Sequence, residues 1–388
     1  MAKVLFIIIL LAISAFSVAD NLNKNASPLK VDLAAQYSDN FNPTLKNKAT
    51  AAAFILSAEG ELVSVYDALW LQAKYSGEYT KANIDKKSLT NTNSFAQSEF
   101  SFLGRLHLLK KIYFDASLEY KQEDELFGRG LSKLRLNIVD ADKKKQSNAL
   151  FGITYGGDAD NRSITLNYQQ LDTQYSDINV YSQLFSLLQK KLSLNIKFKL
   201  SSNTRFIALL EQQNDNYDAL LRDDSDKQQI MLGMDWRPSG ISTLSFLMGK
   251  YQRVPNKADK TTGLIWQLLY KYDPRDDLHF IFSSSQSSIV GESAIASDSV
   301  QQQWQLFANY LYSSQWRYYA KLALSNTYFQ EVTNSHSLKD NYMDVGVNFN
   351  IQNYHHIKLS LNYRNVKDSN GTIAYQQNEA SIHWLYDF

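Results

Sequence analysis

Apolar and polar residues alternate along much of this chain, from about residue 30 to its end. In residues 192–200, five apolar side chains alternate with Ser, Asn and two Lys. A spacing of two is that of a β-strand whose faces meet different surroundings. The same alternation recurs in residues 112–120, 164–168, 343–351 and 357–364. The pattern therefore predicts an all-β chain.

Short turn signals and long polar stretches lie in alternation between these segments. The short set comprises 110–111, 158–161, 201–203, 237–240, 273–276, 313–315 and 352–354, with a weaker eighth near Val65 to Asp67. Most of these are rich in the Gly, Pro, Asn, Asp and Ser that tight turns need. The long set lies at about 40–48, 81–93, 122–145, 174–180, 217–227, 254–261, 288–299, 331–340 and 367–373.

Eight tight hairpins with one further strand at each end predict 18 strands, and irregular spacing over residues 1–100 leaves 16 as the alternative. Most segments run to ten or more residues, which lets a tilted strand cross a hydrocarbon layer. Short turns on one rim and long loops on the other are typical of an antiparallel transmembrane β-barrel of the outer membrane. We therefore expect a closed barrel, with the short turns in the periplasm.

The amino-terminal sequence predicts secretion. Lys3 precedes an apolar run at residues 4–11, and Ser17, Val18 and Ala19 supply the small residues of a cleavage site. The run is too short to span a bilayer, so we expect a signal peptide at residues 1–19 and a single barrel domain at residues 20–388.

The last strand carries a pattern of its own. Apolar side chains stand at Ile382, Trp384, Tyr386 and Phe388, with His383, Leu385 and Asp387 between them. This ending resembles the terminal strand of bacterial outer-membrane barrels, which the insertion machinery reads. The resemblance implies a Gram-negative outer membrane, with its lipid and the barrel-assembly machinery as partners. We expect the four apolar residues to face lipid and their strand to pair with the one near Lys30.

Composition narrows the possible functions. The chain has no cysteine, which excludes disulfides, a lipoprotein anchor and a thiol nucleophile. Its 40 basic and 39 acidic residues nearly balance, so nothing indicates a nucleic-acid partner. The chain has 24 Tyr and 6 Trp, and several of them gather near predicted strand ends, as in interfacial girdles. A soluble sheet with aromatics in its core is the alternative.

The polar face of each strand would line the interior of such a barrel. We expect this lumen-lining set to include Asp115, Glu119, Asn195, Lys197, Lys199, Asp235, Lys271, Arg317, Lys321, Asp344, Lys358 and Arg364. Mixed charges suit a hydrated path for a polar solute and do not predict strong ion selectivity. A wet, filled interior without transport is the alternative interpretation.

The longest loop, at 122–145, holds an acidic cluster from Glu123 to Glu125 followed by basic residues. It either folds inward and narrows the pore or forms a solvated surface loop with a short hairpin at Leu131–Val139. The sequence favours the surface loop.

Enzymatic chemistry finds no support in the sequence. Six histidines are present, but none forms a His-Glu-x-x-His zinc motif. His355 and His356 are adjacent on a strand and point to opposite faces, so they do not chelate one metal. We expect no enzyme activity, no metal and no cofactor.

One strand pair carries a further resemblance. Within residues 232–246 a strand ends in Trp-x-Pro, turns and restarts at Thr-Leu, and Tyr37 to Asn40 place Asp-Asn after the first strand. This sequence pattern resembles that of the barrel-porin family encoded beside exopolysaccharide biosynthesis genes, although the motifs of that family are degenerate.

The resemblance implies exopolysaccharide export across the outer membrane, with polysaccharide and periplasmic export components as partners. Two alternatives stay open: a general diffusion porin for small-solute uptake, and a non-conducting barrel that acts as an adhesin or assembly scaffold.

Overall fold

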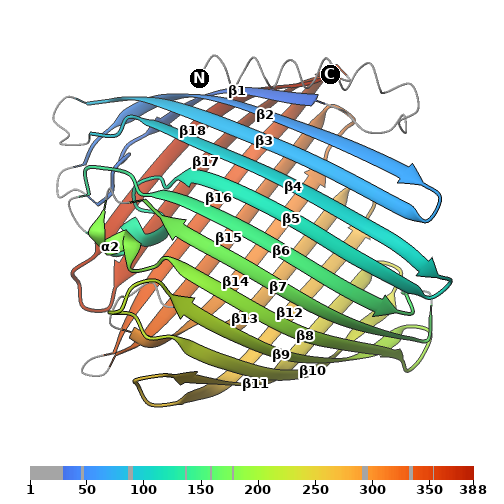
Figure 1. Cartoon of the computed structure of the whole chain (residues 1–388). Helices are drawn as coiled ribbons and strands as arrows, with labels where there is room; N and C mark the ends of the chain where they lie inside the picture. Colours follow the sequence, from blue (N-terminus) through green and yellow to red (C-terminus); the bar gives the residue numbers. More distant parts are fainter. Residues whose placement is uncertain are drawn as a thin grey trace.

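The computed structural model describes residues 29–44, 48–85, 91–135, 138–157, 160–176, 179–290, 296–331, 335–352 and 354–388. The predicted signal peptide lies outside these ranges. The described residues form one closed barrel of antiparallel strands, drawn from the side in Figure 1.

The barrel has 18 strands. They are β1 (Leu29–Ser38), β2 (Ala51–Tyr66), β3 (Leu69–Ile84), β4 (Ser94–Leu109), β5 (Ile112–Asp124), β6 (Lys143–Tyr155), β7 (Arg162–Tyr175), β8 (Leu187–Lys199), β9 (Thr204–Tyr217), β10 (Ser225–Ser239), β11 (Ser242–Pro255), β12 (Thr261–Arg275), β13 (Leu278–Ile289), β14 (Ala296–Leu311), β15 (Trp316–Glu331), β16 (His336–Gln352), β17 (His355–Asp368) and β18 (Ala374–Asp387). Two short helices lie in the connections: the 3-10 helix η2 (Gly130–Leu134) and α2 (Val180–Gln183).

Each strand pairs with its neighbours in the chain, and the two end strands pair with each other. β1 and β18 run antiparallel from Lys30 opposite Asp387 to Ser38 opposite Glu379. This pairing closes the sheet and leaves no strand edge exposed to lipid. The predicted strand number, 18, and the predicted seam are both confirmed.

The two rims of the barrel differ as the turn signals predicted. Eight tight turns join strand pairs at one end, and nine longer connections lie at the other. The weakest of the predicted turns, near Val65 to Asp67, is confirmed, since Asp67 adopts a positive φ of 49° between β2 and β3. In Figure 1 the tight turns lie on the right and α2 marks the long-loop end on the left.

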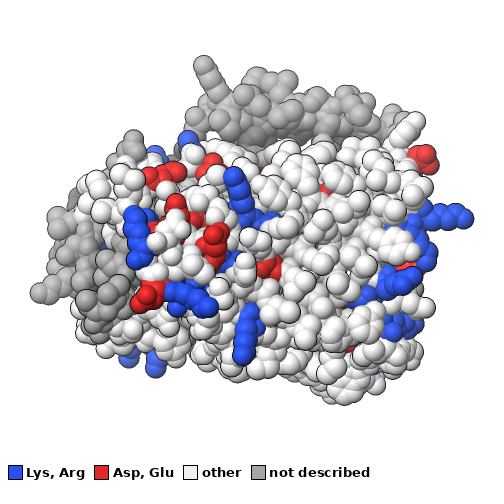
Figure 2. Space-filling model, turned by 60° about the horizontal axis from the view of Figure 1, so that its bottom comes forward, with Lys and Arg blue, Asp and Glu red and all other residues white. Residues whose placement is uncertain are grey.

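The outer wall is apolar and aromatic. In β18, Ile382 and Trp384 are 49% and 43% exposed, whereas the alternate residues His383 and Leu385 are half-buried. Apolar side chains on the outer face of a closed barrel are those that meet lipid. In Figure 2 the charged side chains gather toward the two ends, and a band with few charges lies between them. Among the described residues, no helix is long and apolar enough to cross a membrane.

Buried packing lies inside the barrel near the long-loop end. One cluster joins Phe329, Leu338, Val366, Ile373 and Tyr375, with Leu134 of η2 packed against it. Since Leu134 belongs to the β5–β6 connection, part of this connection fills the interior. A second cluster, described below, packs the same connection against β4.

Candidate functional site: the barrel lumen

The inner face of the barrel wall is identified from the side chains that form hydrogen bonds with a connection folded inside the barrel. Arg364 of β17 and Tyr375 of β18 both donate to the carbonyl oxygen of Gly128, at 2.9 and 2.6 Å. Gly128 lies between β5 and β6, and four strands, β1 to β4, separate β5 from β18 in the sheet. Side chains that reach it from β17 and β18 therefore point inward. Residues directly opposite each other in a sheet share a face, so the register extends this assignment around the barrel.

All twelve predicted lumen residues lie on this inner face by register. These are Asp115, Glu119, Asn195, Lys197, Lys199, Asp235, Lys271, Arg317, Lys321, Asp344, Lys358 and Arg364. The four terminal residues Ile382, Trp384, Tyr386 and Phe388 lie on the outer face. Their roles in transport and in membrane insertion stay predictions.

Several members of this set have close partners on neighbouring strands. Arg105 holds Asp115 with Nε and Oδ1 2.6 Å apart. The Nζ of Lys358 lies 5.3 Å from the ring centre of Tyr319, whose hydroxyl donates to Asp344 at 3.3 Å. The inner wall therefore offers mixed charges held in place by their neighbours.

Residues 125–135 and 138–142 fold into the barrel, and we call them the inner segment. This corrects the preferred sequence interpretation, a surface loop with a hairpin at Leu131–Val139. In its described part the segment forms η2 instead, because local side chains form hydrogen bonds with its backbone amide and carbonyl groups. Leu131 donates its amide to Glu125 Oε2 at 3.2 Å, and the Ser132 hydroxyl donates to the Arg129 carbonyl at 2.7 Å.

An aromatic cluster anchors the inner segment to β4 and to the β1–β2 connection. Phe127 is 2% exposed and meets Phe95 and Phe41 edge-on, with ring centres 5.6 and 6.2 Å apart. Asn42 donates to the Ile138 carbonyl at 2.7 Å. These contacts hold two connections together inside one mouth of the barrel.

Gly128 lets the inner segment approach the wall closely. Its φ is +71°, a left-handed conformation that side chains other than glycine rarely adopt. A Cβ added there would stand 2.3 Å from Pro43 Cγ. Arg129 also forms an ion pair with Glu379 at 3.6 Å.

The other side of the inner segment binds α2. Asp142 is buried and accepts hydrogen bonds from Arg135 and from Ser182 of α2. The Arg135 guanidinium lies 4.9 Å from the ring centre of Tyr181. The inner segment is thus held from β17 and β18 on one side to α2 on the other.

Glu125 is the titratable group most altered by this arrangement. It is 8% exposed, and its Oε1 lies 3.3 Å from the Tyr175 hydroxyl. Burial raises the pKa of Glu125 to about 7, although Lys144 and the Leu131 amide act in the opposite direction. A carboxyl group at the base of the inner segment therefore changes charge near neutral pH.

The described end of the β13–β14 hairpin, residues 287–289 and 298–299, also bends inward, and we call these residues the hairpin tip. β12 pairs with β13 only as far as Trp266 opposite Gln286, whereas β13 and β14 stay paired up to Ile289 opposite Ser299. Beyond Gln286 the hairpin leaves β12 and contacts the inner faces of β10 and β11. Lys227 Nζ donates to the Ser288 carbonyl at 3.3 Å.

A buried charge network fixes this tip. Arg253 of β11 lies 2.7 Å from Asp215 of β9 and 3.3 Å from Asp298 of β14. All three are almost fully buried. Asp298 also accepts from Tyr251 at 2.8 Å and from Thr261 at 2.9 Å. Buried charges persist only when paired and hydrogen-bonded, as these are.

The inner segment and the hairpin tip narrow the lumen at the long-loop end. Contacts run from β18 through the inner segment to α2, and Arg222 lies 4.8 Å from the Phe185 ring centre next to α2. Arg222 also donates to Tyr217 of β9 at 2.8 Å, close to the Asp215 end of the charge network. A chain of side-chain contacts therefore runs inside this mouth of the barrel from β18, through the inner segment and α2, to β9.

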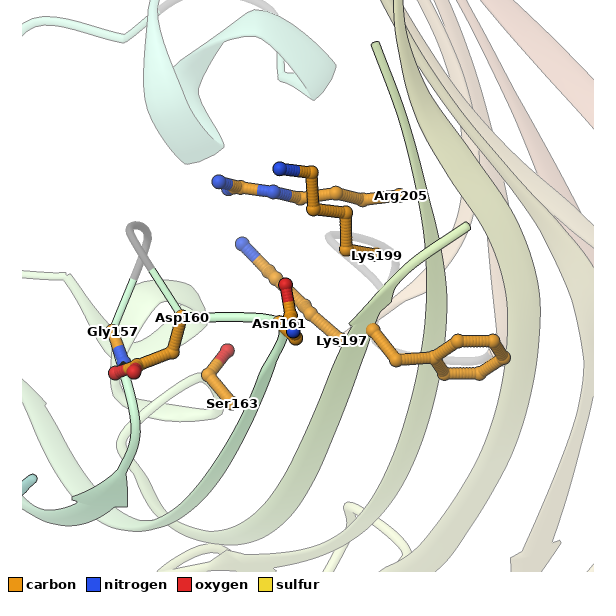
Figure 3. Close-up of a pocket in the computed structure, with 8 residues that line it drawn as sticks. Gly157, Asp160, Asn161, Ser163, Lys197, Lys199 and Arg205 are labelled. Carbon is orange, nitrogen blue, oxygen red and sulfur yellow. Dashed lines mark hydrogen bonds between the residues drawn. The ribbon is translucent and has the colours of Figure 1, made fainter. Parts of the chain in front are cut away.

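The opposite end of the lumen carries a basic cluster. Lys197 and Lys199 of β8 and Arg205 of β9 extend in the same direction beside the turn at Asp160, as Figure 3 shows. Lys199 stands directly opposite Arg205. In the adjoining turns, Lys111 lies 2.8 Å from Asp160, whose pKa this contact lowers. Three cations on one wall favour anionic solutes near this end.

The adjacent histidines behave as their spacing predicted. His355 stacks on Trp384 of the outer face at 5.8 Å, whereas His356 lies 2.8 Å from Asn350 and 3.3 Å from Asp387. The described residues contain no group of three or more potential ligands that could hold a metal ion.

The charge network of Asp215, Arg253 and Asp298 was not among the predicted site residues. Each stands near a strand end, in stretches that the sequence alone assigns to loops or their borders. Only the bend of the hairpin tip brings Asp298 to Arg253.

No family model and no curated protein matches the chain. It is similar to solved structures of the FrpB iron transporter from Neisseria meningitidis. For the F5-1 variant in its apoprotein form, identity is 11% and the TM-score 0.52, over 91% of this chain and 63% of that one. This chain therefore spans less than two-thirds of that relative's length.

A second structure of the F5-1 variant gives 8% identity and a TM-score of 0.52, over 96% of this chain and 84% of the other. A BenF-like porin from Pseudomonas fluorescens gives 14% identity and a TM-score of 0.49, over 93% and 98%. Likenesses this distant show the fold alone. A closed barrel with an apolar belt belongs to the outer membrane of Gram-negative bacteria, and we place the protein there.

Proposed function

We propose that the protein is a narrow outer-membrane channel through which small polar solutes diffuse. The observation that carries this proposal is the inward fold of the inner segment and of the β13–β14 tip. An 18-stranded barrel can enclose an aqueous path, and two inward-folded segments restrict its width at one end. The inner wall remains polar and charged along its length.

The same observation favours the diffusion porin over polysaccharide export. An export path must admit a hydrated polymer, whereas here Phe127, Gly128 and Asp298 pack inside one mouth against the opposite or neighbouring wall. The basic cluster at the other end favours anionic solutes over neutral polymers.

Single-channel recording and solute uptake test this proposal directly. The purified barrel is reconstituted in planar bilayers to record its conductance. It is also reconstituted in liposomes, whose rate of swelling in solutions of neutral sugars of increasing size measures solute uptake. We expect discrete conductance steps, a reversal potential shifted toward anions, and swelling that falls steeply beyond small oligosaccharides. Deleting residues 126–141 should raise both the conductance and the size limit.

The alternatives give different results in the same measurements. A folded barrel without conductance would indicate an adhesin or scaffold. Passage of long oligosaccharides through the intact protein at rates close to those of monosaccharides would indicate export. A control deletion of the three residues 257–259 in the β11–β12 connection should leave conductance unchanged, because the hydrogen bonds of Lys257 and Ala258 go to Leu220 and Asp223 of the neighbouring connection.

A further inference from the structure

The outer wall has a depression where β16, β17, β18 and β1 run side by side. Its volume is about 350 Å³, within the range of roughly 300–1,000 Å³ typical of small-molecule pockets. Most of the side chains that line it are outward-facing: Tyr37, Asp39, Met343, Val345, Leu361, Tyr363, Asn378 and Ala380. The Asp39 carboxylate accepts hydrogen bonds from Asn378, at 2.7 Å each, so this acidic group already has a partner within the wall. The small side chain of Ala380, flanked by Tyr37 and Leu361, leaves room there.

The chemistry of this wall changes in steps toward the long-loop rim. Met343 stands opposite Tyr363, then Asn341 opposite Asn365, then Lys339 opposite Lys367. Strands rise about 3.3 Å per residue, so the lysine pair lies roughly 13 Å along the strand from Met343. An apolar depression, an amide row and a pair of cations thus follow one another on the face that meets the membrane.

Among the described residues, the lysine pair has no anionic partner. Both side chains are exposed and outward-facing, and like charges directly opposite each other destabilise a sheet. Their outward neighbours on the flanking strands, Asn326 and Ala374, are neutral. Among the described residues, no carboxylate forms an ion pair with either ammonium. The site is therefore complementary to an external anion.

We propose that this ladder binds an anionic lipid of the outer leaflet, a phosphorylated glycolipid with its phosphate between Lys339 and Lys367. The sugar hydroxyls meet the amide row, and an acyl chain lies in the depression beside Ala380. Phosphate suits paired ammonium groups, and basic sites at the membrane surface recognise anionic headgroups in this way. The proposal is independent of what the lumen conducts.

Lipid retained by the purified barrel tests the site. The protein is extracted in mild detergent, incubated with rough-type lipopolysaccharide, washed and examined by native mass spectrometry. We expect one tightly held lipid, and at least a fivefold loss of it in the double variant Lys339→Gln, Lys367→Gln. The groove-filling variant Ala380→Leu should lower retention while it keeps the cation pair.

The control removes two outward lysines elsewhere on the wall. The double variant Lys190→Gln, Lys250→Gln loses the same charge but no cross-strand pair, so its retention should equal that of the wild type. Equal losses in both double variants would overturn the proposal, since they would indicate general charge attraction. Retention of zwitterionic phosphatidylcholine, which has no net charge, at the same level would overturn it too. So would an oligomer that Ala380→Leu dissociates without any bound lipid.

Discussion

Replacing Phe127 with alanine should release the inner segment and widen the channel. Phe127 is 2% exposed and contacts two other phenylalanines, so its truncation removes most of the aromatic anchor on β4. A buried Phe→Ala change costs about 3–5 kcal/mol. Every 1.4 kcal/mol is a factor of ten, so the ratio of inward to released conformations should fall by about two to three and a half powers of ten.

Single-channel recording measures this change. The Phe127→Ala barrel should show longer or more frequent high-conductance states and a larger size limit in liposome swelling. The other anchors of the segment, at Gly128 and Asp142, remain in place, so we expect frequent opening rather than permanent release. Folding is checked first, by the heat-induced shift in electrophoretic mobility that intact barrels show.

The matched control is Phe151→Ala, which removes the same group from the outer wall, where Phe151 is 44% exposed. It should leave conductance unchanged. If the folded Phe127→Ala protein conducts like the wild type, without additional open states, then the inner segment does not limit flow. If both variants widen the channel equally, the effect comes from a general loosening of the barrel.

Three further predictions follow from particular groups. Because the pKa of Glu125 is raised to about 7, the inward conformation binds a proton that the released one loses at lower pH. The inward fold is therefore most stable below about pH 4.5 and weakens as pH rises to about 7, and Glu125→Gln should abolish this pH dependence of open probability in bilayers. Removing Phe388 should lower the yield of heat-modifiable barrel in membranes if it forms part of an insertion signal, while secretion to the periplasm stays normal. Cysteine at Lys358 should react with a water-soluble maleimide through the lumen, whereas cysteine at Leu359 should react only with a lipid-soluble reagent, and the reverse pattern would overturn the assignment of faces.

The strands and their pairing followed from the sequence because both depend on local features. A period of two fixes which side chains share a face, and tight turns need particular residues at particular positions. Counting turns therefore gave the strand number, and the number placed β18 beside β1. The same parity placed residues such as Lys197 and Lys358 on the polar face without knowledge of their partners.

The narrowed mouth could not be predicted in this way. The bond between Tyr375 and Gly128 joins residues 247 positions apart, and nothing local distinguishes an inward loop from an outward one. The hairpin expected near Leu131 fails for a similar reason. Glu125 and Ser132 satisfy the backbone of η2 where strand partners would otherwise be required, and the aromatic cluster stabilises the resulting turn.

The two obstructions of the lumen differ in what holds them, so they should respond to different conditions. The inner segment depends on aromatic packing and on Glu125, whose charge changes near neutral pH. The hairpin tip depends instead on the ion pairs of Arg253 with Asp215 and Asp298, and these pairs are too deeply buried for salt to screen them strongly. Recordings across pH should therefore vary the inner segment alone and leave a residual constriction at the tip. Truncating Arg253 would strand two buried carboxylates at a cost of about 3–5 kcal/mol and release the tip at every pH. Conductance in the double variant Arg253→Met, Glu125→Gln should then be independent of pH. In this variant the tip is released, and the inner segment that remains in the lumen no longer responds to pH.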